Sequence, residues 1–440
     1  NYSDRLAYFD TLKTNRRTVS GTLVDQFHFT IPTDEYQQRV SSGASAGYGF
    51  EVAVLNSSPP RDIRIAFTDP NTPAATANIA RGAKILQVDG VDAVNGGSQA
   101  NVDVLNAALF PSAAGQNHTF VLQDVGSAQT RTVTLTTQIV TSSPVNTTKV
   151  INTPNGNVGY ILFNTFGTSI AEEQIVNAMN QMAGSNVSDL VIDLRYNGGG
   201  FLAISAELGY MVAGAVNTNG RTFDSLTFND KHPAVNPVTG ANITPTPFYS
   251  QTQGFSLAAG QNLPSLNLNR VFILSTDGTC SASEALINGL RGIDVEVVLI
   301  GSKTCGKPYG FYATDNCGET YFTVQFRGEN NKGFGDYSDG FNPANTANVF
   351  GEMITGCAVP DDFSRQLGDE NEALLAAALQ YKSNGTCPAT SLSTKQSASN
   401  TKAYSGVGEP GDLLADPRVQ QRMRLKNLRI ENMPNHKDTP

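Results

Sequence analysis

The chain has 440 residues, of which 39% are hydrophobic and 16% charged, and its formal net charge is −9. These values are typical of a folded protein of two or three domains and exclude a largely disordered chain. No basic stretch is interleaved with aromatic side chains, so we expect no nucleic-acid partner. No apolar run approaches the roughly 20 residues that span a bilayer, so we expect no transmembrane segment.

Residues 1–44 form a short segment with two helical patterns, too small to enclose a core alone. Residues 45–140 are predicted to form a small β-rich domain. Alternating apolar residues and turn signals indicate strands at 47–55, 62–67, 82–90, 119–122 and 132–137, and short helices at 73–80 and 102–108. The stretch 141–157 is rich in Ser, Thr, Pro and Asn and predicts a linker.

Residues 145–387 alternate strand and helix patterns, which predicts an α/β domain whose sheet is covered by helices. Strands are expected at 158–163, 189–194, 270–275 and 295–300, and helices at 171–183, 201–213, 283–291 and 372–381. The polar, proline-bearing stretch 217–265 indicates an insert. Low-complexity sequence begins after residue 387, so 388–440 is predicted to be a flexible tail, with one helix in its last thirty residues.

No two of the five cysteines form a C-x-x-C pair, so a thiolate zinc site is not expected. We predict disulfides between Cys305 and Cys317 and between Cys357 and Cys387, because each pair flanks loop-like sequence. Cys280 is then free. Such bonds indicate an oxidising compartment, and five reduced thiols in a cytosolic protein are the alternative.

Ser281 stands at the predicted turn from strand 270–275 into helix 283–291. A helix N-terminus offers free backbone N–H groups and its dipole to a developing negative charge, so Ser281 is a candidate nucleophile. The same run, Ser281-Ala-Ser-Glu284, also fits the S-x-x-E capping box, whose only role is to start a helix.

Lys307 follows Gly306 just beyond the predicted strand 295–300. In a strand–helix–strand unit the carboxyl ends of both strands meet at one edge of the sheet, which would bring Lys307 near Ser281. A lysine serves as general base for a serine only when its pKa is lowered, usually by burial. The alternative is an ordinary surface lysine, and Lys303 is a neighbouring candidate.

A glycine-rich stretch, Asp193-Leu-Arg-Tyr-Asn-Gly-Gly-Gly200, follows another predicted strand. Glycines let the backbone approach a substrate closely, and their N–H groups suit one half of an oxyanion hole. A plain flexible turn is the alternative. A nucleoside triphosphate site is not expected, because the spacing G-x-x-x-x-G-K-[ST] is absent.

Histidine is scarce, and the candidate segments contain none of His28, His118, His232 and His436. A Ser–His–Asp triad would need His232, which lies in the polar insert. A serine–lysine pair is therefore the natural alternative. No His/Glu cluster has metal-ligand spacing, so we expect neither a metal nor another cofactor.

In this order along the chain, four segments resemble the C-terminal processing (tail-specific) peptidases of family S41. Gly47-Tyr-Gly-Phe50 resembles the carboxylate-binding loop of a PDZ domain, and Ala80–Gly90 resembles a later PDZ strand. Asp193–Gly200 resembles the family pattern D-L-R-x-N-x-G-G. Ser281-Ala-Ser-Glu284, followed by Gly306-Lys307, resembles its S-A-S-E and G-K.

The resemblance implies an S41 (crotonase-like ββα) catalytic domain over residues 145–387, preceded by a PDZ-like domain over 45–140. It implies Ser281 as nucleophile and Lys307 as general base. An oxyanion hole would use the backbone N–H groups of Gly198, Gly199 and Ala282. A substrate tail would bind at the turn formed by Gly47, Tyr48, Gly49 and Phe50. The polar residue that the family often has four positions after the lysine is here Phe311, which leaves the third catalytic partner open.

The implied function is a serine endopeptidase that cleaves exported polypeptides and selects their C-terminal tails through the PDZ-like domain. The alternatives are an inactive peptide- or ligand-binding module of the same fold and an esterase. The implied location is periplasmic or secreted, with a lipid anchor at a removed N-terminus left open. The sequence does not address the oligomeric state.

Overall fold

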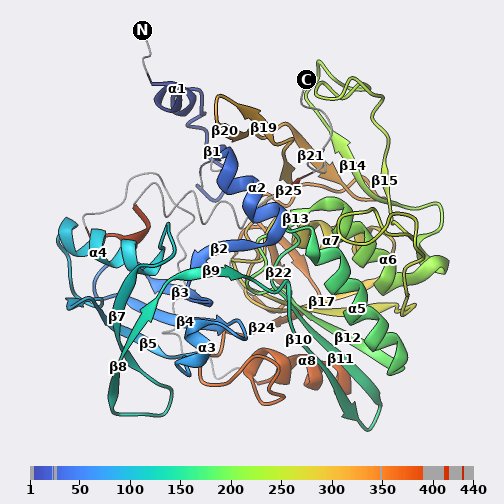
Figure 1. Ribbon diagram of the computed structural model, residues 1–440. Coiled ribbons are helices and arrows are strands. Elements are labelled where there is room, and N and C mark those ends of the chain that lie inside the picture. Colours follow the sequence, from blue (N-terminus) through green and yellow to red (C-terminus); the bar gives the residue numbers. More distant parts are fainter. Residues whose placement is uncertain are drawn as a thin grey trace. The chain divides into compact units, whose positions relative to one another are not determined.

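The structure, a computed structural model, describes residues 4–21, 23, 27–346, 349–389, 411–415 and 429–430 (Figure 1). The chain divides into two compact units. Unit 1 comprises residues 1–41, 144–358 and 424–440, and unit 2 comprises residues 42–143 and 359–423. This division differs from the predicted one, because the N-terminal segment joins unit 1 and the residues from 359 onward join unit 2.

A six-stranded sheet lies at the centre of unit 1, in the order β10-β11-β12-β16-β17-β24. Its strands are β10 (Val145–Thr153), β11 (Gly156–Phe163), β12 (Val187–Asp193), β16 (Arg270–Ser275), β17 (Glu296–Gly301) and β24 (Gly356–Ala358). β10 is antiparallel to β11, and the other neighbours are parallel. The inner strands are buried on both faces, which explains apolar runs such as Leu190–Ile192.

Three long helices pack on this sheet, α5 (Ile170–Gly184), α6 (Leu202–Thr218) and α7 (Ala282–Gly292). α6 lies beside both α5 and α7 (Figure 1). α5 connects β11 to β12, and α7 connects β16 to β17, as crossovers between parallel strands require. The predicted α/β class is confirmed for this unit.

Two sequence predictions in unit 1 need correction. The stretch 141–157 was predicted to be a linker, but Val145–Thr153 is the edge strand β10. The N-terminal segment contains the expected helices α1 (Arg5–Thr11) and α2 (Thr33–Ser42), but also a strand, β1 (Phe29–Pro32). Phe29 and Ile31 are buried in the core of unit 1, so this segment shares that core.

Short strands that the sequence did not indicate make up the rest of unit 1. They form the sheets β1-β20-β19 and β15-β14-β21-β18 and the pairs β13-β25 and β22-β23. Their bounds are β13 (Gly200–Phe201), β14 (Thr222–Thr227), β15 (Thr246–Pro247), β18 (Tyr309–Gly310), β19 (Thr314–Asn316), β20 (Glu319–Phe322), β21 (Phe326–Glu329), β22 (Phe341–Pro343), β23 (Glu352–Ile354) and β25 (Arg429–Ile430). Only β14 and β15 fall in the predicted insert.

Unit 2 contains a sheet with strand order β3-β4-β5-β7-β8, to which β6 adds beside β5. Its elements are β2 (Ala44–Gly47), β3 (Phe50–Asn56), β4 (Asp62–Thr68), α3 (Pro73–Thr76), β5 (Lys84–Val88), β6 (Val91–Asp92), α4 (Gln99–Leu109), β7 (Asn117–Gln123), β8 (Thr130–Thr136), β9 (Gln138–Thr141), α8 (Ala373–Asn384) and the 3₁₀ turn Leu413–Ala415. The strands and helices expected over 45–140 therefore occur in the expected order. Ser98 caps α4 by accepting the Asn101 N–H at 3.2 Å.

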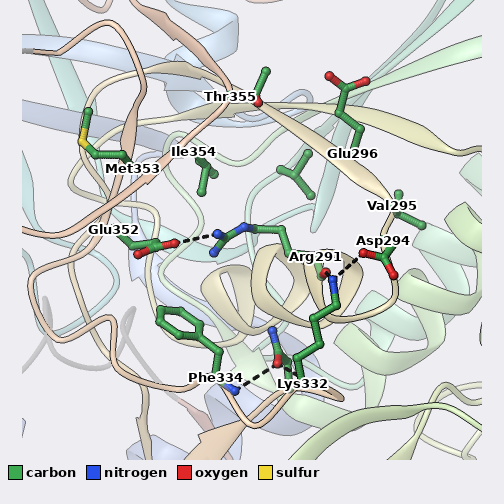
Figure 2. Close-up of a pocket in the computed structure, with 12 residues that line it drawn as sticks. Arg291, Asp294, Val295, Glu296, Lys332, Phe334, Glu352, Met353, Ile354 and Thr355 are labelled. Atoms are coloured by element: carbon green, nitrogen blue, oxygen red, sulfur yellow. Dashed lines mark hydrogen bonds and ion pairs between the residues drawn. The ribbon is translucent and has the colours of Figure 1, made fainter.

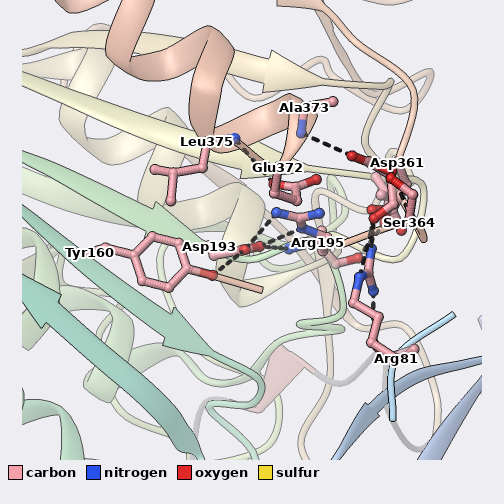
Figure 3. Close-up of polar contacts among 12 residues, drawn as sticks. Arg81, Tyr160, Asp193, Arg195, Asp361, Ser364, Glu372, Ala373 and Leu375 are labelled. Atoms are coloured by element: carbon pink, nitrogen blue, oxygen red, sulfur yellow. Dashed lines mark hydrogen bonds and ion pairs between the residues drawn. The ribbon is translucent and has the colours of Figure 1, made fainter. Parts of the chain in front are cut away.

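Arg81 explains why residues after 358 belong to unit 2. Its buried guanidinium pairs with Asp361 at 2.6 Å and donates to the Ala66 carbonyl at 2.7 Å (Figure 3). It also lies 4.4 Å from the ring centroid of Phe363. A buried charge needs such partners, so this arginine holds the returning chain in place.

Most of the predicted tail 388–440, including the helix expected near its end, lies outside the described residues. Among the helices that the structure does describe, none is long and apolar enough to cross a bilayer.

Candidate active site

Three loops leave the same edge of the unit 1 sheet. Asp193, at the end of β12, is paired with Leu274 of β16, and Ser275 is paired with Gly301 of β17. The carboxyl ends of these parallel strands therefore coincide, where α/β sheets commonly bind ligands. The predicted glycine loop follows β12, Ser281 follows β16, and Lys307 follows β17.

Ser281 sits in a strained turn immediately before α7. Its φ of 58° and ψ of −109° are unusual for a residue with a side chain. The side chain is fully buried, and no hydrogen-bond partner of its Oγ is found among the described residues. Ala282 is the first residue of α7, so its N–H is one of those that a helix leaves without an intrahelical partner. A buried, unpartnered hydroxyl is thus held at a helix N-terminus.

Glu284 joins the serine loop to the lysine loop. Its fully buried carboxylate accepts the backbone N–H of Ser281 at 3.0 Å and that of Lys307 at 2.8 Å. It also accepts the Gly306 N–H at 2.8 Å and the Thr304 hydroxyl at 2.6 Å. Burial raises the pKa of Glu284, and these hydrogen bonds oppose the rise. One carboxylate therefore fixes the backbone at both candidate residues.

A disulfide joins the same two loops. Cys280 and Cys305 are bonded, with their Cα atoms 5.2 Å apart, and Cys317 is free and exposed. The predicted pair Cys305–Cys317 is therefore wrong, because the β16–α7–β17 crossover brings Cys280 to Cys305 first. Cys357 and Cys387, the second predicted pair, are both disulfide-bonded cysteines.

Lys307 is buried, with 1% of its surface exposed. Its Nζ lies 4.1 Å from the ring centroid of Phe311 and 5.1 Å from that of Phe27. Phe311, found where the family often has a polar residue, thus contacts the amine through its ring face. Lys303, the neighbouring candidate, is exposed. Burial distinguishes the two lysines.

Asn197 connects the glycine loop to the serine loop. Its side-chain Nδ2 donates to the Phe163 carbonyl at 2.9 Å. Its backbone carbonyl oxygen accepts the Cys280 N–H at 3.1 Å and the Ser283 hydroxyl at 2.9 Å. Its Oδ1 accepts the Gly199 N–H at 3.0 Å. The Gly199 N–H is thereby engaged, which leaves Gly198 as the glycine better suited to receive an oxyanion.

The start of the glycine motif is structural. Arg195 and Asp193 are both fully buried and form a two-pronged ion pair, at 2.9 Å from Nε and 2.8 Å from Nη2. Tyr160 donates to the same carboxylate at 2.8 Å (Figure 3). This pairing compensates two buried charges and fixes the end of β12, from which the glycine loop departs.

The predicted peptide-binding turn lies in unit 2, between β2 and β3. Gly49 has a φ of +84°, and a Cβ there would meet the Thr72 side chain at 2.2 Å. Tyr48 is buried, and its hydroxyl donates to the Ala108 carbonyl at 3.0 Å. β3 follows the turn and lies at the end of its sheet, paired only with β4 among the described strands. Tyr48 thus supports the turn, while β3 offers a strand edge.

A cavity of about 430 Å³ lies away from these loops (Figure 2). Arg291, in the last turn of α7, forms an ion pair with Glu352 there at 2.7 Å. Ser281 precedes the first turn of the same helix, ten residues earlier, which corresponds to roughly 15 Å along the axis. This cavity is therefore not part of the candidate site.

Comparison with known proteins identifies the domain. The profile of peptidase family S41 matches residues 157–311, which include the glycine loop, Ser281 and Lys307. The chain carries a peptidase family S41 domain.

Two relatives and one solved structure show how far the similarity extends. The chain is 28% identical over 289 residues to a carboxyl-terminal-processing protease of Picosynechococcus sp., covering 65% of this chain and 60% of that one. It is 31% identical over 187 residues to the chloroplastic C-terminal processing peptidase of Tetradesmus obliquus, covering 40% and 38%. A Bacteroides fragilis protein assigned to the S41 proteases has the same fold, with a TM-score of 0.61 at 22% identity over 88% of this chain and 91% of its own. The chain thus spans about 60% of the first of these curated relatives.

Two residues at the candidate site have roles that the sequence did not indicate. The sequence indicates Glu284 only as part of a helix cap, and it indicates no role for Asn197. Both lie inside the motifs that carried the resemblance, so the signal was present as residue type and position. What the sequence lacked was the set of backbone groups that each side chain contacts.

Proposed function

We propose that the protein is a serine peptidase in which Ser281 is the nucleophile and Lys307 the general base. The observation that carries the proposal is the shared anchor of the two residues. Glu284 accepts the backbone N–H of each, and the Cys280–Cys305 disulfide links their flanking residues. This arrangement ties a strained serine to a buried lysine from a different loop.

The proposed reaction is acyl transfer. Ser281 Oγ attacks the peptide carbonyl while Lys307 Nζ takes the hydroxyl proton, and that proton passes to the departing amine. Water then attacks the acyl-enzyme, with Lys307 again taking the proton. Lys307 returns that proton to Ser281 Oγ as the acyl–oxygen bond breaks and the acid leaves. The N–H groups of Ala282 and Gly198 would stabilise the oxyanion, aided by the N-terminus of α7.

An inactive binding module is the main rival, with Ser281 as a simple helix cap. A cap serine keeps an extended backbone and uses its oxygen to accept an N–H of the first turn. The Glu284 half of a capping box is present, since its carboxylate accepts the Ser281 N–H at 3.0 Å, but Ser281 has positive φ and its Oγ has no partner among the described residues. A strained residue with an unused hydroxyl favours a reactive role.

A fluorophosphonate probe tests the nucleophile directly. We expect it to attach to the intact chain at Ser281, identified by mass spectrometry of the labelled peptide, with hydrolysis of casein blocked in parallel. Ser283→Ala is not a neutral control, because Ser283 bonds to Asn197, whereas Ser302→Ala changes an exposed serine of the next loop. Labelling elsewhere, or equal labelling of Ser281→Ala, would refute the assignment.

We further propose that unit 2 is PDZ-like and selects substrate tails at residues 47–50. The support is the edge of β3 with which no other described strand pairs, beside a glycine turn, which suits addition of an extended peptide whose carboxylate meets backbone N–H groups. Peptides ending in a free carboxylate should therefore show a lower KM than the same peptides ending in an amide. Equal KM values for the two forms would contradict this selection.

An esterase is the second alternative to a peptidase. It would hydrolyse small esters but neither of these two peptides.

The disulfide should matter for the proposed activity. Cys305→Ala removes the link between the serine and lysine loops, and misplacement of catalytic groups by about 1 Å can cost roughly 100-fold in rate. We expect kcat for peptide hydrolysis to fall by about 10- to 100-fold. Cys317→Ala, which removes the free exposed cysteine, is the matched control and should retain full activity. Equal kcat values for both variants would show that the link is dispensable.

The same disulfide supports the proposal that the protein is active in an oxidising compartment, either the periplasm or the extracellular space. Polypeptides are the proposed substrates.

A further inference from the structure

Two residues near the C-terminal end of the sequence, Arg429 and Ile430, lie beside the proposed oxyanion loop. β25, Arg429–Ile430, pairs in parallel with β13, so that Gly200 is opposite Arg429 and Phe201 is opposite Ile430. β13 begins directly after Gly199, the end of the proposed oxyanion loop. β25 also lies beside β18, which begins two residues after Lys307.

Only one edge of β13 is open to pairing with a further strand, because the other edge is already paired. On its other side, Phe166 pairs with Gly200, donating to the Gly199 carbonyl at 2.8 Å and accepting the Phe201 N–H at 3.1 Å. The edge that β25 occupies is therefore the one open to an incoming strand. Paired strands lie roughly 4.8 Å apart, so the backbone of β25 runs one strand spacing from the residue that follows Gly199.

From this placement we propose that β25 occupies the position of a substrate strand and restrains the peptidase from within the chain. The inference rests on the proposed function, since it names the internal competitor of the same site. Backbone pairing at a strand edge depends little on side chains, so any extended polypeptide of an unfolded substrate fits the same edge. A tethered segment has a high effective concentration and competes without high intrinsic affinity.

Two shortened chains separate β25 from the rest of the tail. A chain that ends at Leu428 lacks β25, and a chain that ends at Ile430 keeps it and serves as the matched control. We expect the chain ending at Leu428 to hydrolyse an unfolded peptide with kcat/KM about 10-fold above both the control and the full chain. Ile430→Pro in the full chain, which removes a strand N–H, should behave like the shorter chain.

A binding measurement keeps this proposal separate from the peptidase assignment. A fluorescent peptide of residues 424–440 is added to Ser281→Ala versions of both shortened chains, and its anisotropy is recorded. If the peptide binds to the chain ending at Leu428 and not to the chain ending at Ile430, the internal strand is supported. This holds even if no chain hydrolyses peptides, and then only the peptidase proposal fails. Equal hydrolysis by all chains, with no binding of the peptide, overturns the internal strand and leaves the peptidase intact.

Discussion

Lys307→Met will abolish most peptide hydrolysis, whereas Lys303→Met will leave it unchanged. Methionine is close in size to lysine and apolar, so it fits between the rings of Phe27 and Phe311 without opening a cavity. Only the amine is lost. A general base of this kind contributes about 10²- to 10⁴-fold, so kcat should fall by about 10³-fold.

The kcat of Ser281→Ala should fall further, because this change removes the oxygen atom that forms the acyl-enzyme. Losses of roughly 10⁶-fold are typical when a serine nucleophile is removed. The residues act as a unit, so the double variant should be no slower than Ser281→Ala alone. Both variants and Lys303→Met are compared by kcat for one peptide, with thermal unfolding as a check on the fold.

Two outcomes would contradict the serine–lysine pair. If Lys307→Met retains the wild-type kcat while Ser281→Ala is inactive, the base is a different group. If Lys303→Met is as slow as Lys307→Met, the loss reflects the conformation of the lysine loop rather than one amine. Lys303 is exposed and Lys307 is buried. Because both variants replace a lysine by methionine, a difference in kcat between them reflects where the lysine lies.

Local sequence patterns were sufficient for the inner strands and the long helices of unit 1 and for the main strands of unit 2, but not for the short strands of unit 1. Apolar runs such as Val271–Leu274 have the length and composition of buried parallel strands, and they occur where expected. The edge strand Val145–Thr153 was missed because its polar and β-branched residues resemble a linker in composition. Threonine and valine also have high strand propensity, so the composition fits either a linker or a strand. Pairing with β11 makes this segment a strand.

The candidate pair was predictable because it depends on topology. A strand–helix–strand unit places the residues after β16 and after β17 at one sheet edge, which brought Ser281 and Lys307 together in the prediction. The same reasoning applies to Cys280 and Cys305, which stand one and two residues before them, but the predicted pair Cys305–Cys317 rested on the loop-like sequence between those cysteines instead. Contacts of single side chains, such as those of Glu284, follow only from the folded backbone.

Glu207→Gln should stabilise the protein, and more strongly as the pH rises. Glu207 of α6 is buried, and its Oε1 accepts the Gln253 N–H at 2.8 Å. Beside it, the buried Glu172 carboxylate accepts four backbone N–H groups of the insert, from Gln253, Gly254, Ser256 and Leu257, at 2.8–2.9 Å. Burial, and then the charge of Glu172, raise the pKa of Glu207 from 4.5 to about 9.

The sign follows from proton linkage. Between about pH 4.5 and pH 9 the folded protein keeps a proton on Glu207 that the unfolded chain releases, so stability falls as the pH rises through this window. Glutamine keeps the acceptor oxygen and cannot ionise in either state. Since one pKa unit corresponds to about 1.4 kcal/mol, the full shift would make the variant more stable than wild type by about 5 kcal/mol at pH 8, and we expect at least about 2 kcal/mol.

Thermal unfolding at pH 5, 7 and 8.5 measures this difference for Glu207→Gln and for Glu173→Gln, a partly exposed glutamate of α5. The Tm difference between Glu207→Gln and wild type should grow with pH by several degrees, while that of Glu173→Gln stays constant. A difference for Glu207→Gln that does not change with pH would mean that Glu207 is ionised in the folded protein. The insert would then be held by two buried negative charges, which its four N–H donors to Glu172 alone do not balance.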